Sequence, residues 1–137
     1  MKTAKKGKIL VALTCAFLMT ASGSALAANH GFTFKFTDLT NKTTSSYAKS
    51  DNSQVWYLSL DNSGSNNMSS ANIFGCKMNR TSNNNVDIYH TFSNYVSGYG
   101  ISYQSKVYKN DNMYMGAKKD SASTSTTALT ISGRFAP

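Results

Sequence analysis

The segment GFTFKFT, residues 31–37, alternates between aromatic and polar side chains along its length. Its aromatic positions are Phe32, Phe34 and Phe36. Successive side chains of an extended strand point to opposite faces, so the pattern predicts a strand with one face in a core and the other in water. Such a strand needs a second layer of structure to cover its phenylalanines.

Six further segments predict strands by a similar alternation or by short apolar runs. They are residues 54–60, 71–78, 85–92, 99–109, 113–119 and 127–135. Clusters of Asn, Asp, Ser and Gly separate them, and these residues favour turns because they bond to the local backbone or tolerate a positive φ. The polar residues 38–54 either hold one short edge strand around Tyr47 or form a loop.

The alternation in residues 85–92 predicts one apolar face. Its members are Val86, Ile88, His90 and Phe92. A histidine on such a face is more typical of a satisfied core or edge residue than of a general base.

Gly98 precedes residues 99–109 and Gly100 lies within them, and glycine disfavours a helix, since each costs about 1 kcal/mol relative to alanine in a helix interior. We therefore expect a strand that pairs with residues 113–118 through a tight hairpin at residues 109–113. The side chains expected to point inward are Tyr99, Ile101, Tyr103 and Val107.

Together these segments predict an all-β fold, an antiparallel β-sandwich of about seven strands. A small closed β-barrel is the alternative architecture. Helix signals are scarce, because the chain has no Glu and its apolar positions are mostly β-branched or aromatic.

The first residues predict export. A basic stretch ending at Lys8 precedes twelve apolar or small residues, 9–20, and small residues at Ala25 and Ala27 lie three and one positions before a cut at Ala28. This order is typical of a cleaved signal peptide, and the apolar run is shorter than the roughly 20 residues of a membrane-spanning helix. We expect residues 1–27 to be the signal peptide and residues 28–137 to be a single secreted domain, extracellular or associated with the cell envelope.

Cleavage changes the charge and the cysteine count. Four of the fourteen Lys and Arg residues leave with the leader, so the mature chain carries ten of them against six Asp, a net charge of +4. Scattered charges of this number do not predict nucleic-acid binding but permit a mild attraction to anionic envelope polymers or lipids. Only Cys76 remains, so the domain is expected to be free of internal disulfides, and its thiol to be buried or, as an alternative, paired with another chain.

The chain lacks the familiar signatures of catalysis. No nucleophile elbow, phosphate loop or zinc-ligand cluster is present. His30 lies two residues beyond the predicted cut, where chain termini are commonly loose. We therefore expect no enzyme activity, no cofactor and no metal site.

A binding role agrees better with the composition. Tyrosine rings offer apolar faces, and the surrounding hydroxyls and amides supply hydrogen bonds. The tyrosines expected on outward faces are Tyr57, Tyr108 and Tyr114, although tyrosine is also an ordinary strand former.

The carboxy-terminal third, VYKNDNMYMGAKKDSASTSTTALTISGRFAP, resembles the closing segment of a family of small exported proteins of Gram-positive bacteria that have no assigned function. The similar features are the tyrosine pair Tyr108 and Tyr114, the small residue Ala117, and an ending of Gly, a basic or polar residue, an aromatic and Pro. Phe135 stands where that family usually has Trp. The resemblance implies a signal peptide, a β-rich domain, an extracellular location and no catalytic residues.

These observations favour a secreted, monomeric, non-enzymatic binding or structural protein at the bacterial cell envelope, with a wall polymer or another envelope component as its partner. An alternative is a bacteriocin-like antimicrobial or toxin protein that acts on a target cell's membrane or wall. That alternative would need an amphipathic basic element, which is not visible. A hydrolase would need His and Asp residues to converge in one cleft.

Overall fold

A computed structural model of the chain describes residues 28–82 and 85–137, and these residues form nine β-strands and no helix. The strands are β1 (His30–Phe36), β2 (Lys42–Thr43), β3 (Tyr47–Ala48), β4 (Val55–Leu60), β5 (Phe74–Arg80), β6 (His90–Phe92), β7 (Tyr99–Ser102), β8 (Asn112–Lys119) and β9 (Leu129–Ala136). The residues of the predicted leader, including Ala25 and Ala27, lie outside the described residues, and Ala28 is exposed.

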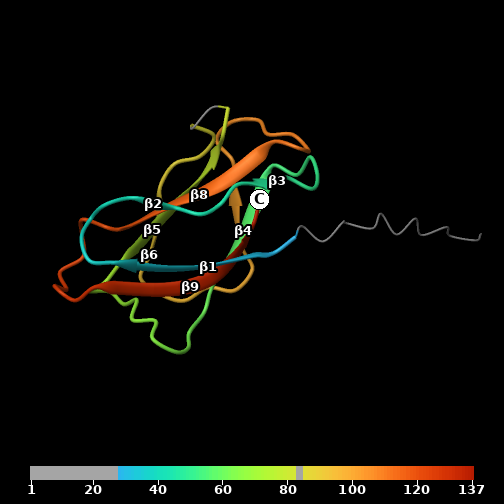
Figure 1. Cartoon of the computed structure of the whole chain (residues 1–137). Coiled ribbons are helices and arrows are strands. Elements are labelled where there is room, and N and C mark those ends of the chain that lie inside the picture. The colour runs from blue at the N-terminus through green and yellow to red at the C-terminus, as the bar shows by residue number, and fades with distance from the viewer. Residues whose placement is uncertain (1–27, 83–84) are drawn as a thin grey trace, which may run out of the picture.

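The strands form two separate antiparallel sheets. The four-stranded sheet has the order β1-β9-β4-β7, and the five-stranded sheet has the order β2-β8-β5-β6 with β3 also paired to β8. Figure 1 shows β1 and β9 side by side in one layer and β2, β8 and β5 in the other. Within the described residues the fold is thus an all-β sandwich and not the closed barrel that was its alternative.

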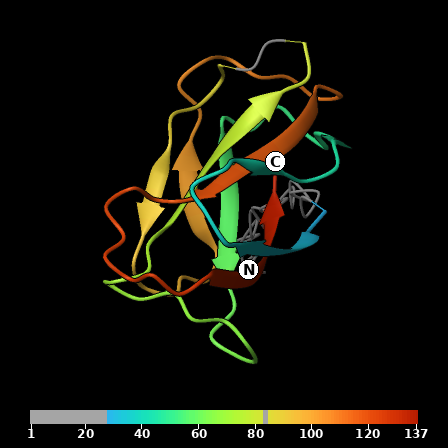
Figure 2. The same ribbon diagram turned by 60° about the vertical axis from the view of Figure 1, so that its left-hand side comes forward.

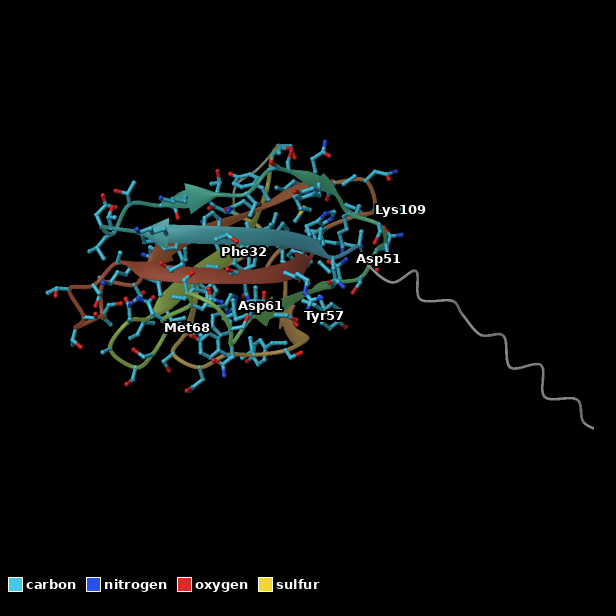
Figure 3. The ribbon with its side chains drawn as sticks, turned by 60° about the horizontal axis from the view of Figure 1, so that its bottom comes forward. Phe32, Asp51, Tyr57, Asp61, Met68 and Lys109 are labelled. Carbon is cyan, nitrogen blue, oxygen red and sulfur yellow. The ribbon has the colours of Figure 1, made fainter. Side chains whose placement is uncertain are left out.

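The phenylalanines of β1 enter the core as the alternation predicts. Phe32, Phe34 and Phe36 are buried, and the residues between them are exposed. β1 pairs with β9 so that Phe34 lies opposite Ile131, and the ring of Phe32 stacks on Phe74 of the other sheet at 6.2 Å between centroids. These contacts join the two layers, and Figure 3 shows where Phe32 lies on β1.

The other long strands supply the rest of the core. Their inward side chains on β4, β5, β8 and β9 are Trp56, Leu58, Leu60, Phe74, Cys76, Met78, Met113, Met115, Ala117, Leu129, Ile131 and Phe135. In Figure 2, β5 and β8 run alongside each other in opposite directions across the five-stranded sheet. The alternation in the sequence therefore predicts correctly which side of these strands is buried.

The prediction for residues 99–109 is wrong in its pairing. Within residues 99–109 only β7 is a strand, and it pairs with β4 in the four-stranded sheet, whereas β8 belongs to the five-stranded sheet, so residues 99–109 and 113–118 do not form a hairpin. A turn does lie at residues 108–111, where Asn110 adopts a φ of 72°. Ile101, Tyr103 and Val107 are buried, but Tyr99 is 52% exposed.

The apolar face expected in residues 85–92 is also only partly present. Val86 and Phe92 are buried, whereas Ile88 is 57% exposed and Asp87 is buried in its place. Regular alternation begins only at His90, because residues 86–89 lie outside any strand.

The polar segment 38–54 contributes the short edge strands β2 and β3. Of the two alternatives for this segment, the one with a short edge strand around Tyr47 is therefore confirmed. β3 places Tyr47 against the core, where its ring stacks on His30 at 3.6 Å between centroids and 16° between ring planes. His30 is therefore the first residue of β1 and not part of a loose terminus. Near β2, the Lys42 ammonium donates a hydrogen bond of 2.6 Å to the Lys35 carbonyl, which covers part of the open edge of β1.

Candidate functional site

The structure places the three tyrosines predicted for binding in three different regions. Tyr57 lies on the outer face of β4, and Tyr114 alternates with buried methionines on β8 of the other sheet. Tyr108 is exposed in the loop before β8, where the Lys106 ammonium lies 5.5 Å from its ring centroid. The structure does not bring the three rings together into one surface.

Tyr57 lies on its sheet beside a glycine. The strand pairing puts Gly100 opposite Tyr57, and a Cβ atom at Gly100 would lie 3.3 Å from the Tyr57 ring. The ring therefore leans over β7 and remains 46% exposed. This arrangement provides a single flat aromatic surface, with Ala136 as its small neighbour on the other side.

A denser cluster lies on the outer face of the five-stranded sheet. The Tyr89 ring has the Lys118 ammonium 4.5 Å and the Lys77 ammonium 5.3 Å from its centroid. Its hydroxyl donates a hydrogen bond of 2.6 Å to Oδ1 of Asn41, which precedes β2. The side chain of Asn79, on β5, lies over Gly116 together with that of Asn41, and it is buried. We refer to Asn41, Lys77, Asn79, Tyr89 and Lys118 as the Tyr89 face.

Glycine makes this cluster possible at the centre of the sheet. Gly116 on β8 is the partner of Lys77 in the β5–β8 pairing. A Cβ atom at Gly116 would lie 2.9 Å from Nδ2 of Asn79 and 3.6 Å from Nδ2 of Asn41, so both amides occupy space that another side chain would take. The exposed Asn41 amide and the buried Asn79 amide thus fill the space above Gly116, with the Tyr89 hydroxyl bonded to Asn41.

The two lysine charges of the Tyr89 face are not paired in salt bridges with any described residue. Within the described residues neither Lys77 nor Lys118 forms a salt bridge. Asp120 lies near Lys118 on the same face, since a Cβ atom at Gly75 would lie 3.7 Å from Cγ of Lys118 and 3.8 Å from Oδ2 of Asp120. Its Oδ1 accepts a 2.8 Å hydrogen bond from the Ala122 amide and so caps the following turn. Both ammonium groups are held by an aromatic ring, an attraction of about 0.5–1 kcal/mol at exposed sites, and remain able to meet an anion.

A shallow depression of about 220 Å³ lies at the edge of the sandwich where β6 and β7 meet. Its lining residues are Thr91, Phe92, Ser93, Asn94, Val96 and Tyr99. The rings of Phe92 and Tyr99 meet edge to face with centroids 5.8 Å apart, so the depression joins the two sheets at this edge.

Asp87 forms a buried polar centre that the sequence did not single out. Its Oδ2 accepts hydrogen bonds from the Trp56 indole at 2.9 Å and the Met78 amide at 3.3 Å. Its Oδ1 accepts from the Ile88 amide at 2.8 Å and lies 2.9 Å from Nε2 of His90. Such a fully bonded carboxylate fixes the segment before β6 to β4 and β5.

The His90–Asp87 pair resembles half of a catalytic triad, but in residues 28–82 and 85–137 no hydroxyl or thiol is hydrogen-bonded to the His90 ring. Within the described residues, Asp87 is the hydrogen-bond partner of the His90 ring. Cys76 lies opposite His90 in the β5–β6 pairing but is fully buried. Burial, and then the nearby Asp87 charge, raise the pKa of the Cys76 thiol, which disfavours the reactive thiolate.

Replacement of Asp87 by alanine is expected to destabilise the domain by about 3 kcal/mol, because the Trp56 indole and the Met78 amide would stay buried without an acceptor. Urea unfolding followed by Trp56 fluorescence measures the change. Asp61→Ala removes the same charge from the partly exposed loop after β4 (Figure 3) and should change stability by less than about 0.5 kcal/mol. Equal effects of the two substitutions would show that the Asp87 bonds do not hold the core together.

A second buried charge lies at the end of the sandwich where β1 begins. The side chain of Lys49 is fully buried, its ammonium lies 3.0 Å from Oδ1 of Asp51, and the ring centroid of Tyr103 is 5.4 Å away. Asp111 nearby binds Arg80 at 3.1 Å. Burial alone would raise the pKa of Asp51, but the hydrogen bonds from Lys49 and Ser53 and the Lys49 charge outweigh it, so this pKa is lowered.

The lowered pKa of Asp51 predicts loss of stability in acid. A carboxyl whose pKa is lower in the folded state stabilises the fold above its unfolded value of about 3.9, and this contribution disappears as pH falls through the folded value. Melting temperatures measured from about pH 6 down to about pH 2 should therefore fall more steeply for the wild type than for Asp51→Asn. Parallel curves would contradict the role of Lys49 as the partner of Asp51.

The Tyr89 face could not be selected from the sequence. The alternation in residues 85–92 puts Tyr89 opposite to the apolar positions, which is a signal for an outward ring. Nothing local to Tyr89 indicates that Lys77, Lys118 and Asn41 lie beside it, because strand pairing brings them there.

Comparison with protein-family models, with curated proteins and with solved structures finds no match for this chain. In residues 28–82 and 85–137, no helix has the length and apolar character needed to cross a membrane. The same residues contain no group of three or more His, Cys, Asp or Glu side chains placed to hold a metal ion. The function is therefore argued from the Tyr89 face itself.

Proposed function

We propose that this protein is exported and acts without catalysis, by binding an anionic polymer of the bacterial cell wall on the Tyr89 face. The observation that carries the proposal is the Tyr89 ring with two ammonium groups near it, 4.5 Å and 5.3 Å from its centroid, neither of which forms a salt bridge with a described carboxylate. A polymer with a repeating phosphate or carboxylate group offers anions to Lys77 and Lys118 and hydroxyl groups to the neighbouring amides.

The electrostatic part of this binding is expected to be moderate. Each lysine near an anionic surface contributes about 1 kcal/mol, and the contribution falls with ionic strength because salt screens exposed charges. The aromatic ring adds an apolar face on which the ring or carbon chain of a wall polymer can pack. The predicted net charge of +4 for the mature chain acts in the same direction.

Two sequence features support the location of the partner. The basic, apolar and small-residue order of the first 27 residues is typical of an export signal. The resemblance of the carboxy-terminal third to small exported proteins of Gram-positive bacteria supports a partner that the domain meets after export.

The test is sedimentation of the protein with isolated walls of a Gram-positive bacterium. The wild type should bind, and binding should weaken as salt is raised. A double variant, Lys77→Gln with Lys118→Gln, should lose about tenfold or more in affinity, since two lysines contribute about 2 kcal/mol. The matched control, Lys35→Gln with Lys109→Gln, removes two exposed lysines outside the Tyr89 face and should bind nearly as the wild type does.

Three comparisons test which molecule supplies the anion and whether the Tyr89 face is what binds it. Walls stripped of their phosphate polymers should lose the protein if phosphate is the ligand and retain it if peptidoglycan carboxylates are. Binding to anionic vesicles but not to walls would overturn the proposal in favour of a lipid surface. Equal loss of binding in the two double variants would show that net charge, and not the Tyr89 face, attracts the polymer.

A further inference from the structure

The predicted cut would leave a short metal-binding sequence as the new amino terminus. Cleavage before Ala28 produces a chain that begins Ala28-Asn29-His30, with histidine in the third position. Ala28 and Asn29 are exposed and precede β1, and His30 is its first residue. Figure 1 shows the blue segment before β1 leading away from the body of the sandwich.

The His30 ring is positioned but leaves its nitrogens available. Its face stacks on Tyr47 at 3.6 Å, and the Phe135 ring centroid is 5.7 Å away. Stacking covers the face of an imidazole, whereas the lone pair of a ring nitrogen lies in the ring plane. Among the described residues no hydrogen bond occupies either ring nitrogen of His30, so Nδ1 can act as a ligand.

The spacing of nitrogen atoms in such a terminus suits a square-planar ion. The free amine of Ala28, the backbone nitrogens of Asn29 and His30, and Nδ1 of His30 follow one another closely enough to form consecutive chelate rings around one ion. Square-planar nitrogen sites are typical of Cu²⁺ and Ni²⁺, and imidazole is a good ligand for both. Coordination displaces protons from the amine and from the two amides, so affinity rises with pH.

The fold tolerates this coordination. Asn29 lies outside any strand, and His30 forms the last rung of the β1–β9 pairing, opposite Phe135. Use of the His30 amide disturbs at most this terminal rung, where opening costs little free energy.

We propose that the mature protein binds one Cu²⁺ or Ni²⁺ ion at its amino terminus, through Ala28, Asn29 and His30, beside the Tyr47 ring. This inference rests on the export and cleavage that form part of the proposed function. It does not depend on the Tyr89 face, which lies on the outer side of the five-stranded sheet.

The first experiment is mass spectrometry of the protein exported by a Gram-positive host. A mature chain that begins at Ala28 is expected, and any other first residue overturns this inference while leaving the wall-binding proposal untouched. Loss of wall binding with an intact Ala28 terminus overturns the proposed polymer and leaves the metal site untouched.

The second experiment is a titration of the protein of residues 28–137 with copper sulfate, followed by visible absorption. We expect one Cu²⁺ per chain, with the absorption band of a square-planar site made of nitrogen ligands. Addition of one glycine before Ala28 changes no side chain but moves the amine away from His30, and it should weaken binding by about a hundredfold or more. Equal affinity of the extended protein would overturn the inference.

Two substitutions identify the histidine. His30→Phe retains a ring to stack on Tyr47 but should abolish the absorption band, and His90→Gln should leave the band unchanged. In proton NMR spectra, Cu²⁺ should broaden the Tyr47 ring resonances at substoichiometric concentrations in the wild type. Binding that survives His30→Phe, or that leaves Tyr47 unaffected, would contradict a site at His30.

Discussion

Replacement of Gly133 by alanine is expected to destabilise the domain by about 3 kcal/mol or more and to prevent stable folding in a marginal background. A Cβ atom at Gly133 would lie 2.2 Å from the carbonyl oxygen of Ser59 and 2.9 Å from Cζ of Phe32. The phenyl ring can turn aside, but the carbonyl belongs to the backbone of β4. Because Gly133 lies opposite both Phe32 and Leu60, relief of the clash must separate β9 from its neighbours.

Gly31→Ala is the matched control for this substitution. Gly31 is exposed on β1, its φ is not positive, and its nearest neighbour to a new Cβ atom is 4.0 Å away. Alanine there should leave stability unchanged or raise it by up to about 1 kcal/mol, because it restricts the unfolded chain. Thermal melts should show a fall of about 10 °C or more for Gly133→Ala. Equal melting temperatures would mean that β4 and β9 are farther apart than the structure has them.

The second large effect is expected for Ile131→Asp. Ile131 is fully buried on β9 opposite Phe34, in the apolar layer between the sheets. An aspartate there either remains ionised without a partner or takes up a proton and still lacks a hydrogen bond. The cost of about 4 kcal/mol or more is a large part of the total stability of a small domain, so this variant should be largely unfolded.

Ser132→Asp places the same side chain one residue further along the strand, on the other face. Ser132 is half-buried and loses only a 3.2 Å hydrogen bond to Asn66, so the cost should be less than about 1 kcal/mol. Circular dichroism in rising urea compares the two variants. If both variants unfold at the same urea concentration, the assignment of Ile131 to the buried face of β9 and of Ser132 to the outer face is wrong.

The core positions were predictable because they depend on a local property. In β1, and over most of β8 and β9, buried and more exposed side chains alternate, and the two faces of a strand differ in burial whatever its partner is. Phe34, Met115 and Ile131 are therefore buried as predicted. The turn at Asn110 was predictable for the same reason, since its positive φ is a local property of the residue type.

The pairing of β7 was not predictable in this way. The alternation of Tyr99 and Ile101 says which side chains share a face, but it says nothing about the neighbouring strand. The chain pairs β7 with β4, some forty residues earlier, and not with the adjacent β8. Asp87 was missed for a related reason, because its main partner, Trp56, lies 31 residues away.

The sequence by itself determined the β architecture and the buried faces of the long strands. Only the tertiary structure decided which strands are neighbours, and so which surface side chains lie together. The physical reason is that side-chain alternation acts between adjacent residues, whereas the Tyr89 face joins Lys77, Tyr89 and Lys118 through sheet pairing. The stack of His30 on Tyr47 likewise exists only because β1 and β3 meet at one edge of the sandwich.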